Sequence, residues 1–543
     1  MRSLRLLFVL AVVVAAPVQA EAAELPYRQP AGATPPNVLP AAQARAASVE
    51  PSTWLVGARP GSATAKAAAS RYGAELLSPR GTYLVGRGRA RAFAAALRAA
   101  GVYRFAEPNR PLQPAQALPG GDEFAATDWR SFLIPPTLTP PPLANAPLTA
   151  VIDGAADPTI PDLAGVRVIR NTAVTDLHGS AVASVIGGRA NGLGMVGVYP
   201  GAPLLSVGTT LTTADVIRCV RAAVAAQAKV INMSYGAPDY SYAEDVELAY
   251  AFSKDVVLIA AAGNDRDTQL ADGTTNPVMY PAALPHVVSV AAMGPTGATS
   301  EFSTANGAVD LSAPGESVLT AVPAGFDDDG VADGYEKLDG TSFAAPIVAG
   351  VAAWLRAAKP QLTNGQIADL MRFTAQDIPP DGWDEDSGYG LVDLASALAA
   401  GDPPLDALEV NDNIDWVDGR RFDTANPFFF TARDRRRTVH GTVDYWKDYA
   451  DVFRVQIPAR RKLTMTLRAA RGTNPDLAAY STRARTIYKR RGQLAWSYRP
   501  AGKTERVTIR NRSRRAKAAY AVVYSPTKKD ARYDAAYTLT VKR

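Results

Sequence analysis

Between residues 148 and 400 of this 543-residue chain, short apolar runs alternate with longer amphipathic ones. The short runs are almost continuously apolar, as is typical of strands buried on both faces, and the longer runs repeat at helical spacing. Strands and helices that alternate in this way form a parallel sheet covered by helices on both sides. We therefore expect an α/β domain with strands at 148–152, 204–207, 230–233, 256–260 and 287–291, and helices at 180–187, 214–228, 243–254, 342–358 and 365–373.

Three polar residues lie where such a domain places its functional site, beyond the carboxyl ends of the strands and at helix starts. Asp153 ends the first apolar run, His178 begins a helix, and Ser342 follows a glycine at the start of another helix. A carboxylate, a base and a hydroxyl are what acyl transfer by an activated serine requires. Taken alone, Ser342 also suits a plain helix cap.

Five motifs occur in a fixed order around these residues. They are Asp153 in its strand, His178-Gly179-Ser180, the run 231–236, the run 260–265 and the run 340–346 with Ser342. In these motifs the chain resembles the subtilisin-like serine proteases over about half its length, from residue 150 to 398. The order Asp, His, Ser along the chain is the one given for subtilisin. The resemblance implies a subtilisin-like parallel sheet with helices on both faces, preceded by a small α+β propeptide and followed by a β-sandwich.

The resemblance also implies a role for each site residue. Ser342 is the nucleophile, His178 the base and Asp153 the group that orients His178, while the side-chain amide of Asn264 and the backbone N–H of Ser342 stabilise the oxyanion. Gly263 and the stretch Ser234-Tyr235-Gly236 would line the substrate site, with backbone that can pair with an extended substrate. As local sequence, Gly263-Asn264 also suits a turn, and Ser234-Tyr235-Gly236 an ordinary exit from a strand.

The chain departs from the family pattern beside two of these residues. Gly154 and Ala155 follow Asp153 where the family usually has Ser or Thr and then Gly. Leu177 precedes His178 where Gly is usual, and Ser180 replaces the common Thr. A missing hydroxyl beside Asp153 removes one hydrogen-bond donor to its carboxylate, which bears on the orientation and the pKa of that group.

The first 143 residues are expected to be a signal, a propeptide and a linker. Residues 1–20 have early arginines, an apolar run and Val18-Gln19-Ala20, as in a bacterial export signal. We assign 21–115 to a propeptide with an ordered part at about 52–112, where strand and helix patterns alternate; an unrelated small α+β domain is the alternative. Self-cleavage should fall after Asn109, and 116–143 should form an exposed linker and the mature N-terminal region before the catalytic domain at 144–400.

Residues 401–543 have a different pattern, with short runs that alternate at period two, which predicts a β-sandwich. This part resembles the C-terminal accessory domain, of the pre-peptidase type, of secreted bacterial peptidases. It holds 31 Lys and Arg against 15 Asp and Glu. No aromatic-basic motif accompanies this charge, so we expect no nucleic-acid partner. Two roles stay open for the domain, a secretion or folding aid and a docking module for acidic substrates.

The sequence gives little support for a metal site or a reactive cysteine. Asp327, Asp329 and Asp333 lie in an acidic loop before Ser342, where oxygen ligands suit calcium, but the spacing is not that of an EF-hand and a solvated loop is the alternative. No other cofactor is expected. Cys219, the only cysteine, should be buried and inert, and the two histidines other than His178, His286 and His440, should be structural.

We therefore expect a secreted serine endopeptidase, extracellular or periplasmic, that is made as a self-processing zymogen. Its partners would be protein or peptide substrates and its own propeptide, which would act as an intramolecular inhibitor. It should be a monomer without a membrane anchor. The alternative is a catalytically inactive protein of the same fold that binds partners through its basic C-terminal domain.

Overall fold

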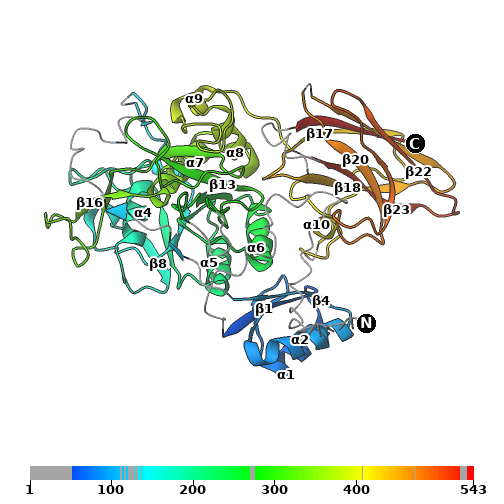
Figure 1. Ribbon diagram of the computed structural model, residues 1–543, viewed down its shortest axis with the longest axis horizontal. Coiled ribbons are helices and arrows are strands. Elements are labelled where there is room, and N and C mark those ends of the chain that lie inside the picture. The colour runs from blue at the N-terminus through cyan, green and yellow to red at the C-terminus, as the bar shows by residue number, and fades with distance from the viewer. Residues whose placement is uncertain are drawn as a thin grey trace, which may run out of the picture.

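The computed structural model describes residues 52–109, 113–114, 118–119, 129, 133–135, 137–268, 275–406, 408–422, 424–470, 472–525 and 535–543. An N-terminal domain lies below the α/β domain in Figure 1, and a β domain lies beside both. The expected signal peptide at 1–20 and the propeptide residues before 52 lie outside the described residues.

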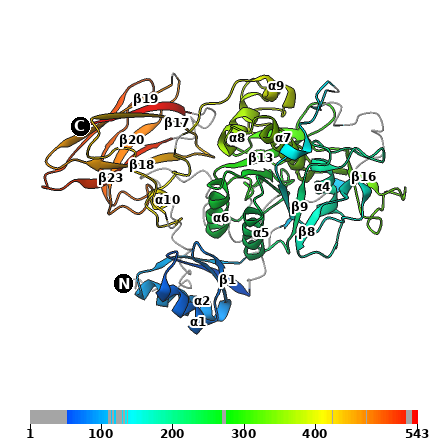
Figure 2. The ribbon, with the colours of Figure 1, turned by 180° about the vertical axis from the view of Figure 1, so that it is seen from behind.

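The N-terminal domain is a four-stranded antiparallel sheet, in the order β2-β3-β1-β4, with two helices on one face. Ser62 caps the first helix by accepting a hydrogen bond from Ala65 N at 3.1 Å. The other face of the sheet packs against α5 (Thr213–Ala225) and α6 (Tyr242–Phe252) of the next domain (Figure 2). Leu55, Leu77 and Phe105 make this contact. The elements are β1 Thr53–Ala58, α1 Ala63–Tyr72, β2 Glu75–Ser78, β3 Thr82–Gly86, α2 Arg87–Ala99 and β4 Tyr103–Pro108.

The α/β domain contains the expected parallel sheet, with seven strands in the order β14-β13-β12-β10-β7-β9-β8. The expected fold class is thereby confirmed. The sequence analysis missed the two edge strands, β8 and β14, because one is flanked by arginines and the other contains Ser312 and Pro314. The strands are β7 Thr149–Asp153, β8 Arg167–Arg170, β9 Leu204–Gly208, β10 Val230–Met233, β12 Val257–Ala261, β13 Val287–Met293 and β14 Leu311–Pro314.

Helices cover both faces of this sheet, and alternate residues of each strand face opposite cores. Val151 belongs to the core under α4 and α7, whereas Ile152 belongs to the core under α5 and α6. By length and composition α7 would also pass as a membrane span, but it is 89% buried inside the protein. The helices are α4 His178–Gly187, α5 Thr213–Ala225, α6 Tyr242–Phe252, α7 Thr341–Ala358, α8 Asn364–Phe373 and α9 Leu394–Ala399.

The C-terminal domain is a β-sandwich, as the period-two pattern predicted. Two four-stranded antiparallel sheets, β17-β24-β19-β22 and β18-β23-β20-β21, enclose one apolar core. A short helix, α10 Ile414–Val417, connects it to the α/β domain. The strands are β17 Arg436–Val443, β18 Ala450–Ile457, β19 Lys462–Ala469, β20 Asp476–Ser481, β21 Gln493–Ser497, β22 Glu505–Arg510, β23 Lys517–Tyr524 and β24 Ala535–Lys542.

The segment 116–143 is not an exposed linker throughout, so that expectation was wrong in part. Trp129, Leu133 and Ile134 are 6%, 7% and 3% exposed and join the core under α4 and α7. The prolines of this segment predicted a linker, but its large apolar side chains stabilise the fold when they are buried away from water.

Candidate active site

Asp153 and His178 are brought into direct contact by β7 and α4. His178 Nδ1 lies 2.8 Å from Asp153 Oδ1, and the backbone N–H of Gly154 donates to the same oxygen at 2.7 Å. Both side chains are buried. Asp153 Oδ2 is buried and has no hydrogen-bond partner among the described residues. The backbone of Gly154 thus supplies one donor to the carboxylate of Asp153. Gly154 has no side-chain hydroxyl to supply a second, and Oδ2 of Asp153 stays without a donor.

Close backbone contact holds this pair in place. A Cβ on Gly179 would lie 2.0 Å from Gly154 O, so only glycine lets α4 approach the end of β7 this closely. Asp176 Oδ1 accepts the backbone N–H of His178 at 2.9 Å at the start of α4. The sequence analysis gave Asp176 no role, although an aspartate just before a helix is a common cap.

The surroundings of His178 favour its protonated form. Burial alone would lower the pKa of the imidazole, but the carboxylates of Asp153 and Asp176 outweigh burial and raise the pKa above 6.5. The ring of His178 lies 5.7 Å from the ring of Phe343, the residue after Ser342. A base with these neighbours can accept a proton and remain stable as an imidazolium.

Ser342 lies in the first turn of α7, behind Gly340, whose φ of 147° disfavours other residues. Its hydroxyl donates to Ser234 O at 3.2 Å, and Ser234 Oγ donates to Ser342 O at 2.8 Å. His178 Nε2 is buried and makes no hydrogen bond to any described residue. The structure therefore joins Asp153 to His178 and Ser234 to Ser342, and it has no hydrogen bond between His178 Nε2 and Ser342 Oγ. Such contacts often tighten only when substrate binds.

Asn264 follows β12 and is oriented by the residue before Ser342. Its Oδ1 accepts hydrogen bonds from Thr341 N at 2.9 Å and from Thr341 Oγ1 at 2.8 Å. Because two donors hold the oxygen, the amide nitrogen is directed away from Thr341. Gly263 has a φ of 109°, and a Cβ there would lie 2.7 Å from Met279 Cγ. Thr341 is a site residue that the sequence analysis missed; only its position beside the nucleophile pointed to it.

Two small antiparallel sheets contain residues next to the proposed site, one directly after Ser234 and the other directly before Gly340. Strand β11, Tyr235–Gly236, pairs antiparallel with β5, Gln113–Pro114. Strand β16, Tyr335–Asp339, leads directly to Gly340 and pairs antiparallel with β15, Val318–Ala321, and with β6, Leu118–Pro119. The side chain of Tyr235 is fully buried in the core, and burial raises the pKa of its hydroxyl well above the ordinary value. Tyr235 therefore contacts β5 through its backbone.

The acidic loop before Ser342 is a solvated turn between β15 and β16. Asp327, Asp329 and Asp333 accept the backbone N–H groups of Gly334, Val331 and Tyr335 at 2.6, 2.8 and 2.9 Å. Among the described residues, they do not form a group whose carboxylate oxygens converge on one point. Each carboxylate instead stabilises its own turn.

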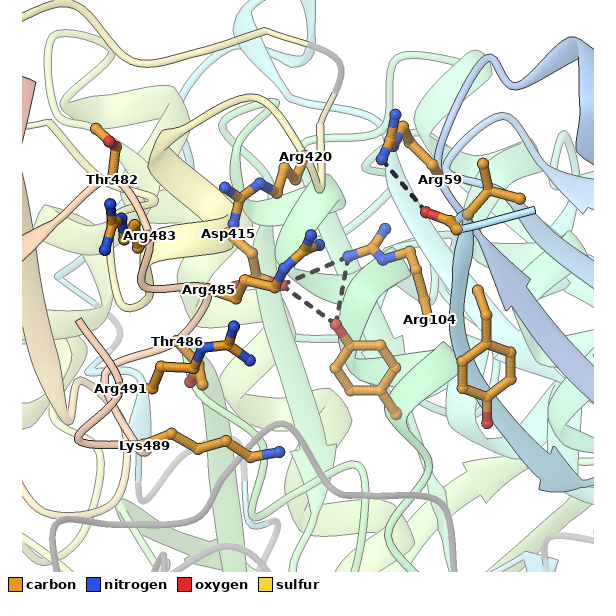
Figure 3. Close-up of a pocket in the computed structure, with 14 residues that line it drawn as sticks. Arg59, Arg104, Asp415, Arg420, Thr482, Arg483, Arg485, Thr486, Lys489 and Arg491 are labelled. Atoms are coloured by element: carbon orange, nitrogen blue, oxygen red, sulfur yellow. Dashed lines mark hydrogen bonds and ion pairs between the residues drawn. The ribbon is translucent and has the colours of Figure 1, made fainter. Parts of the chain in front are cut away.

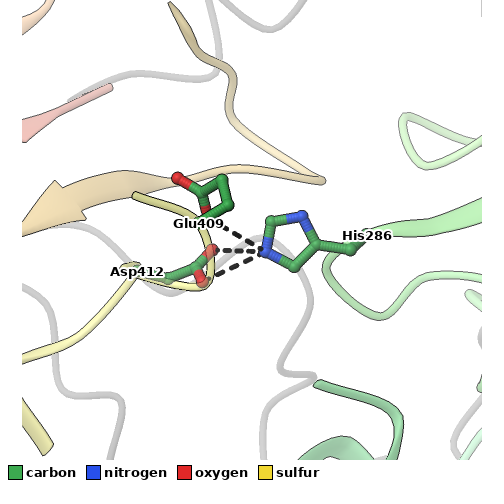
Figure 4. Close-up of side chains that lie close together, drawn as sticks. All are labelled: His286, Glu409 and Asp412. Atoms are coloured by element: carbon green, nitrogen blue, oxygen red, sulfur yellow. Dashed lines mark hydrogen bonds and ion pairs between the residues drawn. The ribbon is translucent and has the colours of Figure 1, made fainter. Parts of the chain in front are cut away.

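Acidic side chains do converge at the junction of the α/β and β domains, where the sequence analysis expected nothing. The ligand atoms of Asp406, Glu409, Asp448 and Asp451 lie within 4.8 Å of one another. His286 Nε2 faces Asp412 at 3.1 Å, with Glu409 at 3.8 Å (Figure 4). The members come from segments far apart in the sequence, so no spacing indicated them. Cys219 is buried, as expected, and burial raises the pKa of its thiol to about 11.

Known proteases of the subtilase family are similar to this chain. A model of the subtilase family matches residues 169–390. Fervidolysin of Fervidobacterium pennivorans is 34% identical over 304 residues, covering 48% of this chain and 42% of fervidolysin. Subtilisin E of Bacillus subtilis is 32% identical over 261 residues, covering 46% of this chain and 64% of that protein. The chain thus spans less than two thirds of the length of these two relatives.

Two further comparisons cover more of the related protein. A subtilisin of Bacillus pumilus is 32% identical, and the match covers 46% of this chain and 89% of that protein. The crystal structure of fervidolysin, described as a keratinolytic enzyme related to subtilisin, is similar with a TM-score of 0.55 at 20% identity, covering 84% of both chains. This structural similarity extends the shared fold beyond the α/β domain.

Proposed function

Because the chain belongs to the subtilase family, we propose that it is a secreted serine endopeptidase whose triad is Asp153, His178 and Ser342. The observation that carries the proposal is the buried Asp153–His178 pair at 2.8 Å, with an unoccupied Nε2 beside the start of α7. An imidazole held in one tautomer by a carboxylate is the base that a serine hydroxyl needs.

Each residue of the proposed site has its own role in the reaction. Ser342 Oγ attacks the peptide carbonyl while its proton passes to His178 Nε2, and Asp153 stabilises the imidazolium. The amide of Asn264 and the N–H of Ser342 donate to the oxyanion. His178 returns the proton to the departing amine, which leaves an acyl-enzyme on Ser342. Water, deprotonated by His178, then releases the acid.

A fluorophosphonate probe tests the nucleophile and its base together. We expect the probe to label Ser342 of the wild type, and labelling to be lost in Ser342→Ala and in His178→Ala, where the hydroxyl remains but the base is gone. The unsatisfied oxygen of Asp153 favours the alternative, an inactive binding protein of the same fold. An unlabelled wild type that folds normally would establish that alternative.

The proposal includes self-processing in the segment 113–119. Residues 113–114 pair with the strand after Ser234, and residues 118–119 pair with the strand that leads to Ser342. A chain that pairs with strands next to the proposed site is bound as an extended substrate is. These pairings support cleavage at one of the four bonds between Pro114 and Leu118, near the expected propeptide boundary at 115. The N-terminal residue of the product identifies the bond.

Contacts of the N-terminal domain support its role as an inhibitory propeptide. The carboxylate of Glu107 accepts hydrogen bonds from Ser241 Oγ at 2.7 Å, Tyr242 N at 3.0 Å and Ala243 N at 3.1 Å, at the start of α6. Asn109 Oδ1 accepts Ala214 N at 2.9 Å, at the start of α5. Two helix N-termini of the α/β domain are therefore capped by residues just before the segment that we expect to be cleaved.

The same proposal assigns 401–543 to an accessory domain and the mature protein to the extracellular space or periplasm. The expected signal at 1–20 and the membership in a family with secreted relatives support export. The substrates would be proteins or peptides, and the protein would act as a monomer.

A structural cation, with calcium as the first choice, fits the group Asp406, Glu409, Asp448 and Asp451 better than the loop 327–333. Asp451 is fully buried, and its Oδ1 has no hydrogen-bond partner among the described residues. Burial and the neighbouring carboxylates raise the pKa values of Glu409, Asp448 and Asp451 well above the ordinary range. Such a group is stable only with protons or with a cation, and oxygen ligands of this kind suit calcium.

Thermal unfolding of Ser342→Ala tests the cation without reference to activity. We expect calcium to raise the Tm, a chelator to lower it, and Asp451→Asn to abolish the difference. The triple variant Asp327→Asn/Asp329→Asn/Asp333→Asn is the control and should keep it. A Tm that responds to pH but not to calcium would show that protons alone neutralise the group.

A further inference from the structure

A cavity of about 620 Å³ lies where the three domains meet, and none of the proposed catalytic residues lines it. The N-terminal domain contributes Arg59 and Arg104, and α6 contributes Tyr242. The β domain contributes most of the remaining wall, from α10 and from the loop 482–492 between β20 and β21. In Figure 3 the side chains of Arg59 and Arg104 face those of the loop across the cavity.

The lining is strongly cationic. Seven cationic side chains surround one carboxylate, that of Asp415, and they are Arg59, Arg104, Arg420, Arg483, Arg485, Lys489 and Arg491. Asp415 is already paired, with Arg104 at 3.5 Å and the hydroxyl of Tyr242 at 3.4 Å.

Four of the other cationic side chains are not paired with a carboxylate among the described residues. Arg420 pairs with Asp418 at 3.1 Å. Arg59, Arg483, Arg485 and Arg491 have no ion-pair partner in the part of the chain that the structure describes. Like charges held this close repel each other, and a bound anion would relieve the repulsion.

The loop 482–492 holds its charges on a fixed backbone. Ala484, Ile487 and Tyr488 are 1%, 3% and 3% exposed. Ile487 N donates to Asn413 Oδ1 at 3.0 Å, and the hydroxyl of Tyr480 donates to Ile487 O at 3.0 Å. The buried residues anchor the loop, while Arg483, Arg485 and Arg491 remain exposed. The cavity wall is therefore preorganised, which lowers the entropy cost of binding.

We propose that this cavity binds a compact polyvalent anion that carries several phosphate groups, and that only the form with the N-terminal domain offers the complete site. Guanidinium groups bind phosphate in a bidentate manner, and several of them around one cavity suit several phosphates on one small molecule. An extended acidic peptide would need a groove instead. The bound anion would bridge Arg59 and Arg104 to the loop 482–492 and hold the N-terminal domain in place.

The phosphates have two conceivable sources, a free phosphorylated molecule and a phosphorylated lipid headgroup. The experiment separates them by using a soluble probe, inositol hexakisphosphate, and vesicles of cardiolipin, a lipid whose headgroup carries two phosphates. Polyglutamate serves as the acidic peptide. The protein is the full chain with Ser342→Ala, so the measurement does not depend on the proposed catalysis or self-cleavage.

Titration calorimetry on this protein should show binding of at least one phosphate-bearing probe. The variant Arg483→Ser/Arg485→Ser/Arg491→Ser should bind it about tenfold more weakly or worse. Arg510→Ser/Arg512→Ser/Arg514→Ser removes the same charge from the same domain outside the cavity, and its affinity should stay within about twofold of the parent, as expected for distant exposed charges.

A second measurement tests the bridge between domains. The probe should slow hydrogen exchange both around Arg59 and Arg104 and in the loop 482–492. The proposal is overturned if both phosphate probes fail to bind, if both triple variants lose affinity equally, or if polyglutamate binds more tightly than either probe. Slower exchange in the loop alone would overturn the bridging role.

Discussion

His178 lies between two carboxylates that affect its proton in different ways. Asp153 touches Nδ1 and fixes the tautomer, whereas Asp176 holds the backbone N–H and acts on the ring through its charge. Burial opposes the imidazolium, yet both carboxylates together raise the pKa of His178. Only the neutral imidazole accepts the proton of Ser342, so activity should fall as the pH decreases through this raised pKa.

Replacing Asp176 should move that fall to lower pH. Asp176→Asn keeps an oxygen for the helix cap but removes a charge that raises the pKa of His178. The acid limb of kcat/KM against pH, measured on a short peptide, should therefore shift to lower pH. Glu301→Gln, an exposed charge change in the same domain, is the control and should leave the limb unchanged. A shift to higher pH would contradict this view of His178.

Thr341 is a positioning residue for the oxyanion site. Its hydroxyl donates to Asn264 Oδ1 and accepts Gly263 N at 3.2 Å. Asn264→Ala should lower kcat by about 10²- to 10³-fold with little change in KM, as for other oxyanion donors. Thr341→Val should give a smaller loss of kcat, and Thr341→Ser, which keeps the hydroxyl, should restore it. Equal losses in the valine and serine variants would assign Thr341 a packing role instead.

Helix α6 makes the affinity of the N-terminal domain for the α/β domain depend on pH. Glu244, in the first turn of α6, is buried, and burial, Glu107 and Asp245 raise its pKa to about 8. When the N-terminal domain leaves, the charge of Glu107 leaves with it and the pKa of Glu244 falls. Because this pKa is higher in the complex, the protonated form favours the complex. The affinity is therefore full below the pKa of the separated form and decreases as the pH rises through about 8.

This effect can be measured after self-cleavage. The fraction of N-terminal domain that stays bound, followed by size-exclusion chromatography from about pH 6 to about pH 9, should decrease with rising pH. Glu244→Gln removes the titrating group and should flatten the dependence. Glu301→Gln should behave like the wild type. A complex that tightens as the pH rises would show that another group controls the release.

The sequence predicted elements well where the apolar run is continuous and poorly where exposed or polar residues interrupt it. The central strands and α4 to α8 follow from continuous apolar runs and from helical spacing of the apolar residues. The edge strands β8 and β14 and the short β2 were missed because exposed or polar residues interrupt their patterns. The site residues came from motif order, whereas Thr341 and Asp176 act through hydrogen bonds that only the folded chain reveals.

At the scale of the whole molecule, the β domain inserts charged side chains into the α/β domain. Lys447 is 5% exposed, and its Nζ donates to Val287 O at 2.7 Å and lies 3.2 Å from Asp310. Arg421 is fully buried, pairs with Asp245 at 3.0 Å and stacks 4.2 Å above Trp416. No sequence pattern indicated these contacts, because their partners lie in other domains. They favour a β domain that is retained after maturation.

Arg421 offers a test of this attachment. Arg421→Met would leave the carboxylate of Asp245 without its buried cation, and such a change costs about 3 to 5 kcal/mol of stability. Denaturant unfolding of the Ser342→Ala protein should show this loss, and adding Asp245→Asn should recover part of it. Arg420→Met, at the neighbouring and partly exposed position, should cost about 1 kcal/mol or less. Equal losses for the two arginines would argue against a tightly attached β domain.

The most direct test of the proposed function is the N-terminal sequence and mass of the secreted protein, for wild type and Ser342→Ala expressed side by side without other proteases. We expect the wild type to begin at a residue from 115 to 118, and Ser342→Ala to keep residues 52–114 attached. A wild type that keeps these residues, or a variant that loses them at the same bond, would contradict self-processing by this triad.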